Sequence, residues 1–552
     1  MVKARLRAIV DQCYQKGIAQ GLWSDLAAGV YTLEEPKQAA HGDFSTNLAM
    51  IVAGKEKKNP REIAAKFTEL LSQHTEIIEK VEIAGPGFVN VFLHVKVWQS
   101  VLPEVVKGGD TYGLSDIGHG KKVMVEFVSA NPTGPLSVGH GRQAVLGDSI
   151  ARLLVATGHE VTREYYYNDA GRQMRVLGES TRARYLEQLG LPFEFPEDGY
   201  QGEYITDIAK ALVDEVGDTL KDAVAETPFK ERAEKAIFDD INNTLLRMDI
   251  RFDNYFNEHT LYEDGLIDDV VATLREKGLV YDHEGAVWFK TTEFGHDQDR
   301  VIIKSTGEPT YRLPDIAYHR EKFKRGFDWM VNIFGSDHIA TVPDVLAGVK
   351  ALGYDESKVT VVLHQFVTLL RDGKQVKMST RKANFITVDE LLDEVGKDVV
   401  RFFFLMRKAD SQLEFDIDLA TKQSQENPVY YVQYAHARLL SIARQAEAQG
   451  VSAGALEDID LGKLSLAEEV NMLKAMDAYP ELVENAALDL EPHRIIFFLQ
   501  DLAGQFHSYY NKHRVISDDI ELSRSRLWMT ETLRIVIGNG LKLLGLNTPR
   551  TM

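Results

Sequence analysis

A glycine- and proline-rich segment, NPTGPLSVGHGR, occupies residues 131–142 and follows the apolar run VMVEFVS. This pattern predicts a strand, a tight turn and then a helix, so that backbone N–H groups and the helix dipole converge on one anion site. Gly134, Gly139 and Gly141 would let a ligand approach the backbone closely. His140 adds a donor suited to the charge that develops on a phosphate under attack by a carboxylate. A tight turn with a capping histidine explains this short pattern equally well.

A second candidate for phosphate chemistry is the polar run RDGKQVKMSTRKANFITVDELL at residues 371–392. The pair Thr387 and Glu390 forms a capping box and predicts a helix after the loop. Cations in a flexible, glycine-containing loop suit a lid that closes over ATP and stabilises the departing pyrophosphate. A solvated run of surface charge has the same composition. The candidate cations are Lys374, Lys377, Arg381 and Lys382.

The bulk composition is that of a multidomain globular enzyme. The chain has 552 residues, of which 44% are hydrophobic and 26% are charged. At roughly 150 residues per domain, three or four domains are expected. The N-terminus lacks the apolar core of a signal peptide, and no window reaches the ~18 apolar residues of a membrane span. We therefore expect a cytoplasmic protein with no membrane partner.

Cysteine and charge counts narrow the choice of cofactors and partners. Cys13 is the only cysteine, which excludes an internal disulfide and a cysteine-rich zinc site. Any metal should therefore be bound by oxygen, as magnesium is. The formal charge of −20 lowers the expectation of a nucleic-acid partner. It does not exclude one, because RNA is bound through local patches and the sum does not show where the 63 Lys and Arg residues cluster.

Three regions of the chain differ in pattern. Residues 1–115 mix helical patterns with short strands, as in an α+β domain. Residues 116–420 alternate strand, turn and helix, which predicts an α/β unit with a Rossmann-like parallel sheet. A charged, mostly helical insertion is expected at about 175–290, before the strand-like runs AVWFKT, RVIIKS, WMVNIFG and VTVVLHQFV complete the sheet. Residues 421–552 predict an all-α helix bundle.

Taken together, the two motifs resemble the HIGH and KMSKS elements of class I aminoacyl-tRNA synthetases, here as SVGH and KMSTR in the expected order. Several other segments are similar to those of arginyl-tRNA synthetases, and the resemblance covers essentially the whole chain. These segments are EFVSANPTGP, YYNDAGRQ, YRLPDIAYHR, FGSDH, NPVYYVQYAHARLLSI, HGDFSTNLAM and GPGFVNVFL. The resemblance implies an N-terminal domain that recognises the tRNA D-loop, a C-terminal bundle that binds the anticodon, and a monomer.

The resemblance also implies an ATP-dependent arginine–tRNA ligase. The arginine carboxylate would attack the α-phosphate of ATP to give arginyl-adenylate and pyrophosphate, and the terminal adenosine of tRNA(Arg) would then take the arginyl group. We expect catalysis to rest on His140, Lys377 and Ser137, with Mg²⁺ accompanying the nucleotide. The residues expected at ATP are Asn131, Pro132, Thr133, Gly134, Pro135, Gly139, His140, Lys377, Met378 and Ser379.

An arginine side chain is a planar cation with five donors, so its pocket needs carboxylates or aligned carbonyls. By resemblance, Glu258, Tyr311 and Asp315 should hold the guanidinium. Ser129 and Asn131 should face the amino-acid backbone. Two further candidates for lining the same cleft are Asp337 and His338, at the end of a predicted strand.

The residues expected at tRNA lie in the first and third regions. Phe88 and Asn90 alternate along a predicted strand and share a face, so one could stack on a base while the other reads its edge. Without the resemblance, Phe88 would be read as a core aromatic. In the bundle, Tyr434 and Arg438 lie four residues apart on one helical face and could meet the anticodon loop with Met552.

The sequence departs from the family pattern at Ser137, where the first histidine of HIGH normally stands. Serine is shorter and uncharged, so we hypothesise a slower adenylation step or a contact bridged by water. Two rival functions compete with the ligase. A small-molecule nucleotidylyltransferase shares the HxGH turn but needs neither the helical tail nor the N-terminal domain. A silent tRNA-binding relative would have lost the chemistry, although His140 and Lys377 remain.

Overall fold

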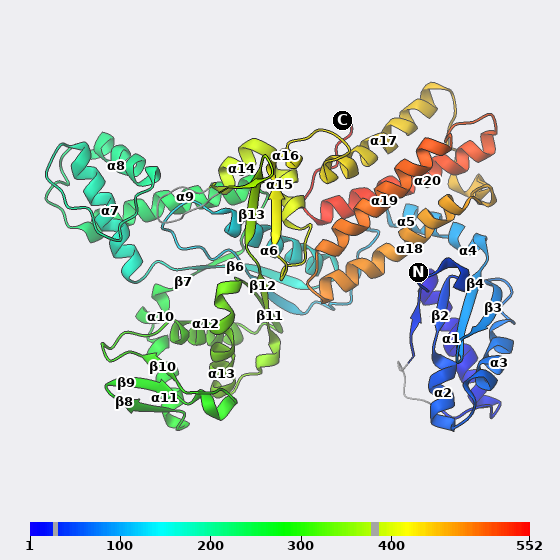
Figure 1. The fold of residues 1–552 in the computed structure, drawn as a ribbon, viewed down its shortest axis with the longest axis horizontal. Helices are drawn as coiled ribbons and strands as arrows, with labels where there is room; N and C mark the ends of the chain where they lie inside the picture. The colour runs from blue at the N-terminus through cyan, green and yellow to red at the C-terminus, as the bar shows by residue number, and fades with distance from the viewer. Residues whose placement is uncertain (26–30, 377–385) are drawn as a thin grey trace.

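The computed structural model describes residues 1–25, 31–376 and 386–552. An N-terminal α+β unit, a central unit built on a parallel sheet and a C-terminal bundle of helices follow one another along the chain (Figure 1). This arrangement confirms the predicted fold class. In the part of the chain that the structure describes, no helix is both long and apolar enough to cross a membrane.

The N-terminal unit packs three helices on one antiparallel sheet of strand order β1-β2-β4-β3. Helix α3 shows why such elements form, because the Asn59 side chain accepts from Arg61 N–H and Pro60 stands at the first helical position. The elements are α1 (Val2–Ala19), β1 (Leu33–Glu34), β2 (Phe44–Thr46), α2 (Leu48–Glu56), α3 (Pro60–Leu71), β3 (Ile78–Ala84) and β4 (Phe88–Leu93). Two short helices, α4 (Val95–Gln99) and α5 (Val101–Gly108), lead to the central unit.

The central sheet has five parallel strands in the order β12-β11-β5-β6-β7. The chain runs from β5 through helix α6 (Val138–Ala156) to β6 and β7 on one side, and later adds β11 and β12 on the other. The carboxyl ends of β5 and β11 therefore form a topological switch point, where α/β sheets bind ligands. The strands are β5 (Lys122–Glu126), β6 (Glu160–Tyr167), β7 (Asn254–Asn257), β11 (Trp329–Gly335) and β12 (Val359–His364).

Two excursions leave the central sheet where one insertion was expected over about 175–290. The first is helical and ends at residue 247, after which β7 rejoins the sheet. The second contains a separate antiparallel sheet of order β10-β9-β8, so AVWF and RVII pair with each other and not with the central strands. The elements of the first excursion are α7 (Arg172–Gln188), α8 (Glu203–Val216) and α9 (Glu231–Arg247). Those between β7 and β11 are α10 (His259–Glu263), α11 (Leu266–Glu276), β8 (Val280–His283), β9 (Ala286–Phe289), β10 (Arg300–Ile303) and α12 (Arg312–Lys324). Helix α13 (Val342–Leu352) lies between β11 and β12.

A small sheet of order β14-β13-β15 and three helices connect the central unit to the bundle of helices α17 to α20. The connecting elements are β13 (Val367–Arg371), β14 (Lys374–Gln375), α14 (Val388–Val395), α15 (Lys397–Phe404), β15 (Leu413–Asp416) and α16 (Ile417–Ala420). The bundle helices are α17 (Pro428–Ala448), α18 (Ala467–Leu488), α19 (His493–Lys512) and α20 (Ile520–Leu543).

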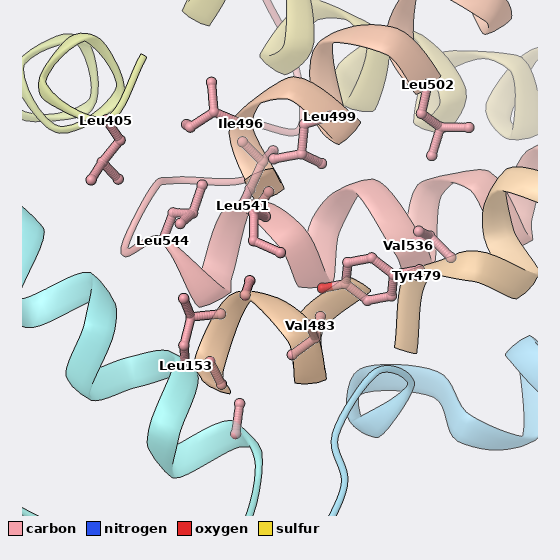
Figure 2. Packing of buried hydrophobic residues seen from close by; sticks show 14 of the residues in the cluster. Leu153, Leu405, Tyr479, Val483, Ile496, Leu499, Leu502, Val536, Leu541 and Leu544 are labelled. Atoms are coloured by element: carbon pink, nitrogen blue, oxygen red, sulfur yellow. The ribbon is translucent and has the colours of Figure 1, made fainter. Parts of the chain in front are cut away.

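The helix that follows β5 belongs to the cores of both units. Figure 2 shows Leu153 of α6 beside Val483 of α18, with Leu499 of α19 and Leu541 of α20 in the same cluster. These side chains are at most 1% exposed. Burying a leucine contributes about 1.5–3 kcal/mol, so the C-terminal bundle and the central sheet share an apolar core around α6.

Candidate active site

The backbone is strained where strand β5 ends. Val128 and Ser129 have φ values of 65° and 42°, in the left-handed region that a β-branched residue such as valine rarely adopts. Such strain concentrates at functional sites. The turn directs the Ser129 hydroxyl inward, where it accepts from Tyr166 N–H at 3.0 Å and lies 3.4 Å from the Glu126 carboxylate. The residue expected at the amino-acid backbone is therefore fixed between two strands of the sheet.

Ser137 and His140 form the first turn of helix α6. The Ser137 Oγ accepts from His140 N–H at 3.4 Å, and the Ser137 N–H donates to His140 Nδ1 at 3.3 Å. Because Nδ1 accepts a hydrogen bond, the proton of the neutral ring lies on Nε2. Burial lowers the pKa of His140, against the opposing charge of Asp337. His140 is thus a neutral imidazole, and its Nε2–H makes no hydrogen bond to the residues that the structure describes.

The end of the cationic loop meets the same turn. Ser137 forms an isolated antiparallel bridge with Thr387, and Val388 N–H donates to the Leu136 carbonyl at 2.9 Å. Thr387 caps helix α14 in the capping box with Glu390 that the sequence predicted. Residues 377–385 lie outside the described part of the chain, and with them Lys377, Met378 and Ser379. The structure places the C-terminal anchor of this loop directly against the HxGH turn.

The segment before α6 is held by the first insertion. The Tyr204 hydroxyl on α8 donates to the Thr133 carbonyl at 2.6 Å, and the Asn131 amide donates to Gln173 at 2.8 Å. A Cβ on Gly134 would lie 3.0 Å from the Tyr204 oxygen, so glycine permits this approach. Pro132 is buried, whereas Asn131 is exposed. The remaining expected ATP residues, Pro135 and Gly139, are half-buried.

Three carboxylates gather beside the switch point, from β5, the start of α10 and the start of α12. Burial, and then the charges of Glu126 and Glu258, raise the pKa of Asp315 to about 7. Burial also raises the pKa of Glu258, and the nearby Tyr166 hydroxyl partly offsets this rise. In the described part of the chain, neither Glu258 nor Asp315 has an ion-pair partner. This acidic cluster, Glu126, Glu258 and Asp315, would be stabilised by a cation.

A buried network of hydrogen bonds connects the acidic cluster with α12 and with strand β11. Lys322 on α12, which is fully buried, donates to Glu126 and, at 2.8 Å, to Asn332 of β11. Asn332 contacts His319 Nε2 at 2.8 Å, while His319 Nδ1 lies 2.7 Å from the Asp315 carbonyl. Burial lowers the pKa of His319 to about 3, so this ring is neutral. The network fixes α12 on the sheet and places Asp315 in the first turn of this helix, beside the other two carboxylates.

Other expected residues lie at the rim. Tyr311 precedes α12 and is 87% exposed. Asp337 and His338 follow β11 and are exposed, with 3.8 Å between the Asp337 carboxylate and His338 Nε2. The charge of Asp337 acts on His140 and on His364 at the end of β12. Asp337 is therefore near the HxGH turn.

Several residues of this site were missed by sequence reasoning, namely Glu126, Tyr166, His364 and Lys322. Glu126 and Tyr166 sit in apolar strand patterns that predict only core. A signal was available on α12, where Asp315, His319 and Lys322 recur at helical spacing. Burial lowers the pKa of His364 to about 4. This ring would therefore contribute hydrogen bonds and not charge.

The two expected tRNA positions differ in their accessibility. Phe88 is 39% exposed, whereas Asn90 is buried and accepts from the Ser45 hydroxyl at 2.8 Å. In the bundle, the Arg438 guanidinium lies 4.7 Å from the Tyr434 ring centre and 5.0 Å from that of Tyr510. These residues and Met552 line a pocket of about 240 Å³. The structure thus brings the predicted bundle residues together on one accessible feature.

The parallel sheet and the turn at its switch point define a class I aminoacyl-tRNA synthetase. Residues 102–409 match the family described as tRNA synthetases class I (R), catalytic domain. Residues 4–93 match the arginyl tRNA synthetase N terminal domain, and residues 432–552 match the DALR anticodon binding domain.

An arginine–tRNA ligase of Desulfotalea psychrophila is 64% identical over the full length of both chains. One of Syntrophotalea carbinolica is 48% identical, also over both full lengths. The chain belongs to the arginyl-tRNA synthetase family.

Solved structures agree with this assignment. A putative arginyl-tRNA synthetase of Campylobacter jejuni superposes with a TM-score of 0.77 at 32% identity, covering 83% of this chain and all of the other. The arginyl-tRNA synthetase of Thermus thermophilus superposes with a TM-score of 0.75 over all of both chains. Its identity of 22% supports the fold alone.

Proposed function

We propose that the acidic cluster binds the guanidinium of L-arginine, the amino acid that this arginine–tRNA ligase attaches to tRNA(Arg). The observation that carries the proposal is the position of the buried Asp315 carboxylate beside Glu126 and Glu258, with no ion pair to Asp315 among the described residues. A guanidinium placed there would remove the repulsion and present planar donors to the carboxylates. Tyr311, exposed at the rim, would close over the bound side chain.

The remaining amino-acid contacts follow from the geometry of the β5 turn. Ser129 and Asn131 would face the substrate's amino and carboxylate groups, which must point toward the HxGH turn. Asp337 and His338 would line the cleft between this position and the phosphates. The arginine carboxylate oxygen then forms a bond to the α-phosphorus of ATP, and the bond to the bridging oxygen breaks, so pyrophosphate leaves with its electron pair.

His140 would stabilise the phosphate charge of this step by donating from Nε2, and Ser137 would hold its ring in that orientation. The turn residues Pro132, Thr133, Gly134, Pro135 and Gly139 would shape the nucleotide site. We assign Lys377, Met378 and Ser379 to ATP from the sequence alone. Mg²⁺ would arrive with ATP and be held mainly by its phosphates. Among the residues that the structure describes, no cluster of three or more His, Cys, Asp or Glu could hold a metal.

In the second step, a ribose hydroxyl of the terminal adenosine attacks the arginyl carbonyl carbon, and AMP leaves. The tRNA would bind along the bundle. Tyr434, Arg438 and Met552 would hold a base of the anticodon loop, because a guanidinium between two rings offers stacking and charge together. Phe88 would stack on a D-loop base, whereas Asn90, expected to read the base edge, is buried and bonded to Ser45 and would instead support the strand that carries Phe88. The protein would act as a cytoplasmic monomer.

The test is ATP–pyrophosphate exchange with tRNA present, comparing arginine with its uncharged analogue citrulline. We expect Asp315→Asn to lower kcat/KM for arginine by about 100-fold, because a desolvated charge pair that loses one partner costs ~2–5 kcal/mol. Discrimination against citrulline should shrink in the same variant. The matched control is Glu263→Gln, which changes an exposed carboxylate on α10, the helix that Glu258 precedes. It should change neither the kcat/KM for arginine nor the discrimination against citrulline.

The same assay separates the rival functions. A silent relative would bind tRNA yet show no exchange with any amino acid. A nucleotidylyltransferase would show exchange with no dependence on arginine. Equal use of arginine and citrulline by the unmodified protein would disprove the assignment of the acidic cluster.

A further inference from the structure

A buried carboxylate outside the acidic cluster, that of Asp344, connects three segments of the chain near the rim of the site. Asp344 lies in the first turn of α13 and is 2% exposed. Three basic side chains converge on its carboxylate. His296 Nδ1 lies 3.0 Å away, Arg300 Nε of β10 lies 3.3 Å away and Arg312 Nε of α12 lies 2.6 Å away. None of these four residues takes part in the contacts proposed above for arginine, ATP or tRNA.

Arg312 differs from Arg300 in its position and in its partners. Arg312 is the first residue of α12, whereas Arg300 begins β10 in the small antiparallel sheet. Arg300 also pairs with Asp297 at 3.0 Å. Among the residues that the structure describes, Asp344 is the single ion-pair partner of Arg312. The position of the Arg312 guanidinium therefore depends on Asp344 more than that of Arg300 does.

The first turn of α12 has no side-chain cap among the residues that the structure describes. Tyr311 stands at the N-cap position, and its side chain makes no capping hydrogen bond there, although such a bond normally stabilises the start of a helix. The hydrogen bond from Asp315 N–H to the Tyr311 carbonyl is 3.4 Å long, compared with the usual distance of about 2.9 Å. The ion pair of Arg312 therefore supplies support that a cap would otherwise give to this turn.

Helix α13 holds Asp344 firmly against α12. The two helices pack side by side (Figure 1). A Cβ on Gly348 of α13 would lie 2.4 Å from the Ile316 side chain of α12, so the close approach of the helices depends on glycine at this position. Asp344 lies four residues before Gly348 and shares its helical face. A carboxylate one turn away from such a contact has little freedom to follow a displaced Arg312.

We propose that Asp344 is a positioning residue for the substrate arginine. Through Arg312 it holds the first turn of α12, and with it Tyr311 and Asp315, in the orientation that binds the guanidinium. This inference rests on the arginine-binding role proposed for Tyr311 and Asp315. Without the pair, this turn must be ordered when arginine binds, which weakens binding. The nucleotide contacts proposed above do not involve α12, so binding of ATP is unaffected.

The test removes one basic partner at a time from the same carboxylate. Arg312→Gln and Arg300→Gln each delete one cation beside Asp344, and both should lower the melting temperature of the ligand-free protein by similar amounts. ATP–pyrophosphate exchange with tRNA present gives kcat and KM for each variant. We expect Arg312→Gln to raise KM for arginine about tenfold while kcat and KM for ATP change less than twofold, which is the pattern of lost uniform binding. Arg300→Gln should leave all three constants unchanged.

A conservative variant separates positioning from a general loss of structure. Arg312→Lys keeps the charge that pairs with Asp344 and should return KM for arginine to within about threefold of the unmodified value. If Arg312→Gln does not fold, Arg312→Met, which retains the apolar stem of the side chain, takes its place.

The outcomes that contradict the proposal are distinct. An equal rise in KM for Arg312→Gln and Arg300→Gln would show that KM follows stability, and would overturn the positioning role. An unchanged KM in Arg312→Gln, where Asp315→Asn has lost arginine use, would overturn that role and leave the assignment of the acidic cluster intact. If neither Arg312→Gln nor Asp315→Asn affects arginine use, both assignments are wrong.

Discussion

At the scale of single residues, the site is defined by buried carboxylates, of which Glu126 is paired with Lys322 while Glu258 and Asp315 have no ion pair among the described residues. Asp315 is held next to two other carboxylates, and its pKa rises to about 7 mainly through burial. A buried carboxylate with no ion pair in the described part of the chain lowers the stability of the fold, which favours a role in binding over a structural one. The strained backbone at Val128 and Ser129 is a second local cost at the same site.

The pKa of Asp315 predicts opposite pH effects on stability and on arginine use. The pKa of Asp315 in the folded protein lies above the unfolded value of about 3.9. The protonated Asp315 carboxyl therefore contributes fully to the stability of the fold below pH 4, and this contribution is lost as pH rises through about 7. Asp315→Asn should therefore raise the melting temperature of the ligand-free protein more at pH 8.5 than at pH 5.5. Thermal scans at both values, with Glu263→Gln as reference, measure this difference.

The catalytic efficiency with arginine should rise with pH, whereas the stability contribution of Asp315 falls, because the guanidinium binds the ionised form of the Asp315 carboxylate. The kcat/KM for arginine reports the free enzyme, and we expect it to fall by up to tenfold per unit as pH drops below 7. A profile that is flat between pH 5.5 and 7, in a protein that stays folded, would contradict the assignment.

At the scale of elements, helix α12 shows what patterns in the sequence can and cannot predict. Its position before a predicted strand and the motif YRLPD pointed to Asp315 as a site candidate, and the structure places this residue beside the switch point of the sheet. The partners of its inward face, Glu126 and Asn332, lie on strands more than 180 residues away from each other. Nothing local in those strands distinguishes them from core. For the same reason, AVWF and RVII predicted strands correctly but not their sheet, because pairing partners depend on turns and tertiary contacts.

The buried pair of Lys322 and Glu126 predicts a specific pattern of stability changes. Lys322→Met alone should lower the free energy of unfolding by about 3 kcal/mol, because it leaves a buried carboxylate without its countercharge. The double variant with Glu126→Met should recover most of that loss, since removing both charges of a buried pair is often nearly neutral. Urea unfolding of both single variants and the double variant gives the coupling energy. Additive losses would show that the two side chains do not act as a pair.

At the scale of the whole molecule, the bundle holds the other two units in place by different means. It joins the central unit through the apolar core around α6 (Figure 2). The segment of α4 and α5 is also firmly docked, with Tyr112 stacked on Tyr479 and its hydroxyl bonded to the Met476 carbonyl at 2.8 Å. The rest of the N-terminal unit lies beside the bundle, away from the central sheet (Figure 1).

Polar contacts to helix α18 set the orientation of that N-terminal unit. Asp477, which is 5% exposed, accepts from Val2 N–H at 3.0 Å, and Lys474 pairs with Asp43 across the same boundary. A tRNA that bridges the unit and the bundle benefits from this fixed orientation, because less freedom is lost on binding. Asp477→Asn should therefore weaken tRNA binding by about tenfold while KM for ATP is unchanged. Glu484→Gln, on the same helix and without an ion pair among the described residues, is the control. The radius of gyration from solution scattering should rise in Asp477→Asn alone, and weaker binding with an unchanged radius would show that Asp477 acts on the tRNA by another route.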